Sequence, residues 1–370
     1  MRGVFWLHLV EVGSIAVVAL FPRCASAQSL RVDPIRVPLN ADARTAELVG
    51  VVVRLDDGAS HPLAVVNHGS PRDPSDRQKM TSYGMWFQAS ALARRGWSVA
   101  LFLRRGYGES GGEWAEGYGR CDNPDYIGAG RAAAQDIEAV AAFMEKQSYV
   151  LPGPWISVGV SAGAFATVAL TADAPKNLSA AIAFAPGRGS TAPDKVCGDQ
   201  GLARAFSRFG QTSRTPLLWV NASNDHFFGP RLVDEWVAGF SSQGGKVTHI
   251  AVGPYGQDGH DLFSAGGEKI WAPLIDYFLE SEGLKLRGEP AAAIRADVAP
   301  PTTLGGEGKK AFGAYLDAAP NKAFAVGPGS GYGWASARET AALARADAMA
   351  FCAGNGVPVN GGAKMCQKAA

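Results

Sequence analysis

Short apolar segments alternate with longer segments of helical periodicity over much of the chain, and this alternation limits the possible fold more than any other feature. The runs at 97–103, 155–159 and 178–184 are of the kind that form strands covered on both faces. Because strands joined through helices pair in parallel, we expect a mainly parallel sheet with helices on both faces over roughly 45–283. The expected strands lie at 47–54, 63–67, 97–103, 155–159, 178–184, 216–220 and 247–251, and the expected helices at 82–95, 129–147, 162–172, 231–240 and 270–279.

The chain is expected to consist of four parts. A largely apolar run follows Arg2 and ends in Ala25-Ser26-Ala27, a pattern typical of a signal peptide. We therefore expect cleavage after Ala27 and a periplasmic or secreted protein, with no stable membrane insertion after cleavage. An uncleaved anchor or a misassigned start codon is the alternative. The parts are a signal peptide at 1–27, the main domain at 28–286, a linker at 287–310 rich in Pro, Ala, Gly and Thr, and a small module at 311–370.

The C-terminal module has its own pattern of elements. The strand-like Phe324-Ala325-Val326 precedes a glycine-rich turn at 327–333 and an Ala-rich helix expected at 337–352. Ser336 and Glu339 have the spacing of a capping box for that helix. The module contains no evident acid–base pair or metal-ligand cluster. We therefore expect a structural or binding role for it.

Charge excludes several classes of partner. The 35 Lys and Arg residues nearly balance the 34 Asp and Glu residues, and no long run of either sign occurs. A nucleic-acid partner is therefore not expected. The chain also lacks a C-x-x-C motif, which removes support for a zinc site or thioredoxin-type chemistry. We expect no cofactor and no metal.

Cysteine usage agrees with export. Loss of the signal peptide leaves Cys121, Cys197, Cys352 and Cys366, an even number that suits an oxidising compartment. Cys352 and Cys366 are close in sequence, and Cys121 and Cys197 lie in long loop-like segments, so we favour these two pairings. Four free buried thiols in a cytosolic protein are the alternative.

The segment Gly159-Val160-Ser161-Ala162-Gly163 is the main candidate for chemistry. An expected strand ends at Gly159 and an expected helix begins at Ala162, so Ser161 lies on a tight turn between them. Small residues on both sides give such a turn its steric clearance. Because a glycine-rich chain contains Gly-x-Ser-x-Gly by chance, the motif needs support from its context.

Two earlier segments supply that context. His68-Gly69-Ser70 directly follows the expected strand at 63–67, and the turn at 105–111 reads Arg-Gly-Tyr-Gly-Glu-Ser-Gly after the expected strand at 97–103. The turn contains Gly-x-Gly-x-x-Gly, but no helix begins there, which argues against a dinucleotide site. With these segments, residues 45–283 resemble the α/β-hydrolase superfamily, whose members commonly carry an Arg-Gly-x-Gly-x-Ser turn at this place. The dienelactone-hydrolase and prolyl-oligopeptidase-like branches are the most similar.

The resemblance implies a fold and a set of site residues. The fold would be an α/β structure with an eight-stranded, mainly parallel sheet, here followed by a small α+β module. The nucleophile would be Ser161, and the backbone amides of Ala162 and of Ser70, or of a residue next to Ser70, would form an oxyanion hole. His68 would brace the oxyanion loop.

Family order places an acid and then a histidine after the serine. Asp225 follows the expected strand at 216–220, and His260 lies in a loop before the last expected helix. His249 competes as the base, but its strand-like surroundings suggest a packed residue. His226 is expected to pack beside the site, and Asp258 and Asp261 to be solvated loop acids that flank His260.

The predicted reaction is acyl transfer to water through an acyl-enzyme on Ser161, with His260 as base and Asp225 as its partner. We expect a small-molecule ester substrate, because no propeller or other gating domain precedes the fold. A serine peptidase, an acyltransferase and a binding protein that kept the fold are the alternatives. Four aromatic residues in the segments 113–127 and 186–210 are candidates for substrate binding or for loop packing: Trp114, Tyr118, Tyr126 and Phe206.

Overall fold

The computed structural model describes residues 29–41, 44–284, 290–292, 298–327 and 331–354. The expected signal peptide, Cys366 and part of the expected linker therefore lie outside the described residues. Among the described residues, no helix is long and apolar enough to cross a membrane.

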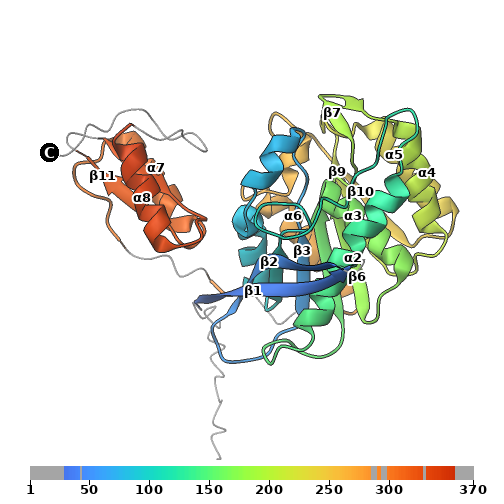
Figure 1. The fold of residues 1–370 in the computed structure, drawn as a ribbon, viewed down its shortest axis with the longest axis horizontal. Coiled ribbons are helices and arrows are strands. Elements are labelled where there is room, and N and C mark those ends of the chain that lie inside the picture. The colour runs from blue at the N-terminus through green and yellow to red at the C-terminus, as the bar shows by residue number, and fades with distance from the viewer. Residues whose placement is uncertain (1–28, 42–43, 285–289, 293–297, 328–330, 355–370) are drawn as a thin grey trace, which may run out of the picture.

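An eight-stranded sheet forms the centre of the main domain (Figure 1), with strand order β1-β2-β4-β3-β5-β6-β9-β10. From β4 to β10 all neighbours pair in parallel, whereas β1 and β2 form an antiparallel ribbon whose second strand also pairs antiparallel with β4. The sheet confirms the predicted fold class. The strands are β1 (Leu30–Ala41), β2 (Arg44–Leu55), β3 (Leu63–Asn67), β4 (Ser98–Phe102), β5 (Trp155–Val160), β6 (Leu178–Phe184), β9 (Leu217–Ala222) and β10 (Val247–Val252).

Strand β1 is absent from the sequence-based expectations. It contains Pro34 and Pro38, which cannot donate to a ladder and usually argue against a strand. Because β1 is the edge strand of the sheet, it pairs with β2 on one side only, and its prolines are tolerated there.

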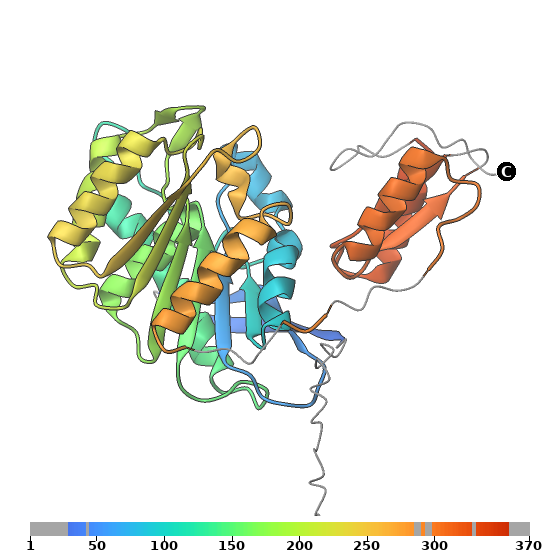
Figure 2. The same cartoon turned by 180° about the vertical axis from the view of Figure 1, so that it is seen from behind.

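Helices cover both faces of the sheet. One core joins the sheet to α2 (Tyr126–Met144), α3 (Ala162–Asp173), α4 (Asp199–Gly210) and α5 (Pro230–Ser242). The other core joins the opposite face to α1 (Trp86–Arg94) and α6 (Glu268–Ser281), and Figure 2 shows α6 lying across that face. The connections also contain the short helices η1 (Pro74–Lys79), η2 (Ser82–Met85) and η3 (Gly259–Leu262) and the short strands β7 (Ser190–Ala192) and β8 (Lys195–Val196).

The C-terminal module has its own small core. It contains α7 (Gly306–Asp317), β11 (Ala323–Val326), β12 (Tyr332–Ala335) and α8 (Ala341–Cys352), and Ala325, Ala335, Ala348 and Cys352 pack together in it. Helix α7 begins inside the segment expected to be linker.

The predicted capping box of the last helix is wrong. Helix α8 begins at Ala341, and the hydroxyl of Thr340 accepts a hydrogen bond from the amide of Leu343 at 3.2 Å. Thr340 caps the helix because its extended backbone places the hydroxyl over the free amides of the first turn. Ser336 lies too far before that turn to cap it.

Candidate active site

Ser161 lies on a sharp turn between β5 and α3, as the sequence predicts. Its backbone has φ 54° and ψ −121°, a region that costs a non-glycine residue about 1–3 kcal/mol. The turn requires both flanking glycines. A Cβ on Gly159 would lie 2.4 Å from the carbonyl oxygen of Gly163, and a Cβ on Gly163 would lie 2.2 Å from that of Asn67.

The strained turn places Ser161 directly before the first residue of α3. Ala162 is the first residue of that helix, so its amide has no partner within the helix. The helix dipole adds partial positive charge at the same point. Gly69 of the loop after β3 approaches from the other side, where its Cβ position would lie 3.3 Å from the Cβ of Ser161. An anion that develops beside Ser161 would therefore lie between two backbone segments, which fits the expected oxyanion hole.

Asp225 and His260 come from loops after neighbouring strands and meet at the carboxyl edge of the sheet. Nδ1 of His260 lies 3.0 Å from Oδ2 of Asp225. The Asp225 carboxylate is only 2% exposed and also accepts the amides of Phe227 at 2.7 Å and Phe228 at 2.9 Å. Asp258 fixes the backbone of His260 by accepting its amide at 2.9 Å. With Nδ1 donating to Asp225, Nε2 of His260 is left to accept a proton.

An aromatic ring further fixes His260. The Phe227 ring stacks on the imidazole with centroids 3.8 Å apart and planes 12° apart. The guanidinium carbon of Arg72 lies 3.4 Å from the centroid of the same Phe227 ring. The guanidinium group and the imidazole ring would clash if both lay on the same face of the Phe227 ring. Phe227 is therefore sandwiched between Arg72 and His260. Sequence reasoning missed Arg72 and Phe227, although Phe227 lies only two residues after the predicted acid.

His226 and His249 lie outside both cavities that Ser161 lines. His226 is exposed and pairs with Asp194 at 3.1 Å, which raises the pKa of its imidazole. His249 lies half-buried in β10 beside Trp219 of β9, and burial lowers its pKa.

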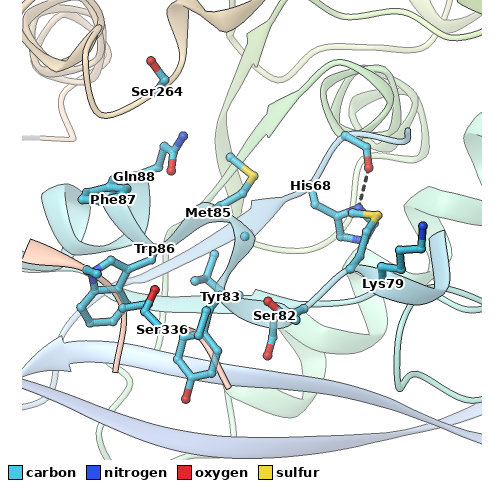
Figure 3. A pocket seen from close by; sticks show the side chains of 18 of the residues that line it. His68, Lys79, Ser82, Tyr83, Met85, Trp86, Phe87, Gln88, Ser264 and Ser336 are labelled. Atoms are coloured by element: carbon cyan, nitrogen blue, oxygen red, sulfur yellow. Dashed lines mark hydrogen bonds between the residues drawn. The ribbon is translucent and has the colours of Figure 1, made fainter. Parts of the chain in front are cut away.

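His68 holds the loop after β3. Its Nε2 accepts the backbone amide of Arg104 at 3.1 Å, so Nδ1 carries the proton and donates to the carbonyl of Gly69 at 2.6 Å (Figure 3). Burial, followed by the charge of Arg104, lowers the pKa of His68 to about 3. Because carbonyl and amide point in opposite directions across a trans peptide, the bond to Gly69 also fixes the direction of the Ser70 amide.

A buried cluster of charged residues lies against the loop that carries His68 and Ser70. Glu116, 1% exposed, accepts hydrogen bonds from Arg104, from Arg188 at 2.6 Å and from the Tyr107 hydroxyl at 2.9 Å. Burial alone would raise the pKa of Glu116, but the two guanidinium groups outweigh it and hold the pKa below its usual range. The Tyr107 oxygen lies 3.0 Å from the Ser70 hydroxyl, which donates to it because the Tyr107 proton is committed to Glu116.

Two cavities meet at Ser161. The larger, about 1200 Å³, is lined by Ser161, His260, the aromatic residues Tyr83, Trp86 and Phe87, and residues of the C-terminal module such as Ser336 (Figure 3). The smaller, about 90 Å³, is lined by Ser161, Ala162, Trp114, Tyr118, Arg188 and Phe228 among others. Ser70, Pro71, Arg72 and Phe227 contribute to both.

Two of the four aromatic residues predicted to bind substrate do not line either cavity. Trp114 and Tyr118 line the smaller cavity, whereas Tyr126 and Phe206 lie in the core. The Tyr126 hydroxyl donates to the carbonyl of Cys197, and the Phe206 ring packs 5.2 Å from that of Trp236. Phe206 belongs to α4, packs into the core between that helix and the sheet, and lines neither cavity.

The predicted disulfide between Cys121 and Cys197 is confirmed. It joins the segment that carries Trp114 and Tyr118 to the segment that carries Arg188, so both walls of the smaller cavity are tied together. The predicted Cys352–Cys366 bridge lies outside the described residues because Cys366 does. No group of three or more His, Cys, Asp or Glu side chains within the described ranges is arranged to hold a metal ion.

Comparison with known proteins identifies structures with a similar fold. The sequence matches no protein-family model and none of the curated proteins. Among solved structures, a protein from Bacteroides ovatus assigned as a dipeptidyl aminopeptidase IV is similar, with a TM-score of 0.51 and 14% identity over 68% of this chain and 36% of that one. An esterase from Pyrococcus furiosus gives a TM-score of 0.49 and 14% identity over 69% of this chain and 92% of that one.

A dienelactone hydrolase assigned in Klebsiella pneumoniae gives a TM-score of 0.45 and 11% identity over 68% of this chain and 99% of that one. At sequence identities this low, the similarity shows the fold alone and no function. The strand order, the turn at Ser161 and the positions of Asp225 and His260 agree with it. The main domain therefore has the α/β-hydrolase fold.

Proposed function

We propose that this protein is a serine hydrolase that cleaves carboxylic esters through Ser161, His260 and Asp225. One observation carries the proposal. A serine held at a strained positive φ lines the same cavity as a histidine whose other ring nitrogen is bonded to a buried carboxylate. Strain of this kind persists where function requires it, and a structural serine gains nothing from it.

The proposed reaction has two steps. His260 accepts the Ser161 proton through Nε2 as Oγ attacks the ester carbonyl, and the Asp225 carboxylate stabilises the imidazolium that forms. The oxyanion is held by the amides of Ser70 and Ala162, each such donor contributing about 3 kcal/mol. His260 then gives its proton to the departing alcohol. Water repeats the sequence on the acyl-enzyme and releases the acid.

Labelling with a fluorophosphonate probe tests the nucleophile. We expect wild-type protein to become labelled at Ser161 and Ser161→Ala to remain unlabelled. Ser82→Ala is the matched control, because Ser82 also lines the larger cavity but belongs to η2, an element separate from the turn at Ser161 and from the loops of Asp225 and His260. Equal labelling of wild type and Ser161→Ala would exclude the proposed nucleophile.

Substrate assays test the reaction class. We expect hydrolysis of p-nitrophenyl acetate to exceed that of aminoacyl anilides in kcat/KM. The peptidase alternative requires the reverse order. An acyltransferase would form ester or amide products when alcohols or amines are added, while releasing little free acid.

We also propose that the protein is exported and loses residues 1–27. The small residues before Gln28 and the Cys121–Cys197 disulfide support export, because disulfides persist in oxidising compartments. N-terminal sequencing of protein isolated from the periplasm or the medium should begin at Gln28. Recovery of the intact chain with reduced cysteines from the cytosol would contradict export.

A further inference from the structure

The two cavities at Ser161 differ in which catalytic groups they contain. His260 lines the larger cavity and is absent from the lining of the smaller one. Ala162, whose amide is a proposed oxyanion donor, lines the smaller cavity and is absent from the lining of the larger one. Ser161 belongs to both, so a bound ester extends across the serine with one end in each cavity.

The chemistry decides which end lies where. In the tetrahedral intermediate the former carbonyl carbon carries Oγ of Ser161, the oxyanion, the leaving alcohol oxygen and the rest of the acyl group. The bond to the alcohol breaks only as His260 Nε2 delivers a proton to that oxygen, which therefore faces His260. The oxyanion faces the amides of Ser70 and Ala162. The acyl group takes the remaining direction, away from His260 and into the smaller cavity.

We propose that this protein is selective for short acyl groups and accepts bulky alcohols, an inference that rests on the proposed function. The smaller cavity measures about 90 Å³. Because a protein cavity of about 150 Å³ holds benzene, this volume corresponds to roughly three or four carbon atoms. Acetyl and propionyl groups fit, and an octanoyl group does not.

Several contacts hold the walls of the smaller cavity in place and oppose its widening for a long chain. The guanidinium carbon of Arg77 lies 3.7 Å from the centroid of the Trp114 ring. A Cβ on Gly106 would come within 2.5 Å of the Trp114 backbone, and one on Gly187 within 2.6 Å of the Phe228 ring. The Cys121–Cys197 disulfide links the two wall segments. Overfilling so tightly packed a site is unfavourable.

The larger cavity suits the alcohol part. Tyr83 and Trp86 lie 6.5 Å apart between ring centroids and, with Phe87, form an aromatic wall on η2 and α1 (Figure 3). Phe87 is 43% exposed although it is a large apolar residue. Its exposure in the cavity that Ser161 also lines is explained if an apolar alcohol covers it in the complex.

Two ester series on wild-type protein test the assignment. In the first, p-nitrophenyl esters extend the acyl group from acetate through butyrate to octanoate, and we expect kcat/KM to fall at least about 100-fold across it. In the second, acetates enlarge the alcohol from methyl through p-nitrophenyl to 2-naphthyl, and we expect no fall with size. A preference for octanoate over acetate, or rejection of 2-naphthyl acetate, overturns the proposal.

Two tryptophan variants provide a matched pair. Trp114→Ala opens the smaller cavity and should raise the octanoate-to-acetate ratio of kcat/KM at least about 10-fold. Trp86→Ala alters the larger cavity and should change the order among the acetates while leaving the acyl-chain profile as in wild type. A shift of the acyl-chain profile by Trp86→Ala and not by Trp114→Ala reverses the two assignments and refutes the proposal.

Fluorophosphonates separate the possible failures. If Trp114→Ala does not fold, wild-type labelling rates with ethyl and octyl phosphonofluoridates whose alkyl chain stands for the acyl group still decide the question, with the octyl compound expected to react at least about 10-fold more slowly. Equal rates refute the chain-length inference and keep the nucleophile. If no compound labels Ser161, the proposed function itself fails.

Discussion

Asp225 and His260 lie 35 residues apart in the chain, yet an oxygen of the Asp225 carboxylate is 3.0 Å from Nδ1 of His260. This contact makes Asp225→Asn a sensitive test. The amide group can present N–H to Nδ1 and so favour the imidazole tautomer that cannot accept the Ser161 proton. We expect kcat for p-nitrophenyl acetate to fall about 10⁴-fold.

Asp194→Asn is the matched control for that variant. Asp194 also pairs with a histidine, His226, but both residues are largely exposed and lie outside the two cavities. Its kcat should stay within about 3-fold of wild type, because exposed pairs contribute little. An equal loss in both variants would show that the Asp225 contact has no special role.

The strain at Ser161 predicts an opposition between stability and activity. Ser161→Gly relieves a backbone held at φ 54°, whereas Ser161→Ala keeps it. Both variants lose the Ser161 hydroxyl, and we expect the free energy of unfolding of the glycine variant to exceed that of the alanine variant by about 1 kcal/mol. Urea unfolding of the pair measures the difference. A less stable glycine variant would mean that the turn is not strained.

Acid should weaken the fold through His68. In the unfolded state the His68 imidazole binds a proton below about pH 6.5. In the folded state its pKa is about 3, so it stays neutral over most of that range. The unfolded state then holds more protons, so stability is lost as the pH falls from about 6.5 towards 3. By pH 5 this loss approaches about 2 kcal/mol.

His68→Asn removes that titration. We expect its free energy of unfolding to fall less between pH 7 and pH 5 than that of wild type, by up to about 2 kcal/mol. His226→Asn is the control, because His226 is exposed and its raised pKa has the opposite sign. Identical pH profiles for wild type and His68→Asn would show that His68 is not a neutral buried group.

The Cys121–Cys197 disulfide should stabilise the main domain. It closes a loop with a sequence separation of 76, for which chain entropy gives about 4.5 kcal/mol as an upper figure. We therefore expect Cys121→Ala/Cys197→Ala to have a lower Tm than wild type. Dithiothreitol should lower the Tm of wild type and leave that of the double variant unchanged. A reductant effect of equal size on both would assign it elsewhere.

The sheet and the candidate site residues could be predicted from the sequence for one physical reason. Buried parallel strands are short and apolar, and their carboxyl ends lie at the same edge of the sheet, so a serine, an acid and a histidine that follow three such strands share that edge. The family resemblance supplied the order of serine, acid and histidine, and the structure brings Asp225 and His260 into contact at the cavity that Ser161 lines. The capping residue of α8 was missed because two hydroxyl residues near the helix start compete, and only the backbone decides between them.

The finer features depended on side-chain packing. The stack of Arg72, Phe227 and His260 joins residues from separate loops, and no spacing in the sequence predicts this contact. Phe206 was misplaced because its segment looks like a loop after β6. The spacing of Leu202, Phe206 and Phe209 fits one face of a helix, and that signal would have placed Phe206 in the core.

The presence of His260 in only one of the two cavities bears on the fate of the proposed acyl-enzyme. In the proposed reaction His260 activates the water that ends the cycle, so this water enters the space that the departed alcohol has just left. A second alcohol retained on the aromatic wall of that space would reach the acyl carbon first. The ratio of transesterification to hydrolysis would then depend on how quickly the first product leaves the larger cavity. Substitutions in the aromatic wall would change this ratio without altering Ser161.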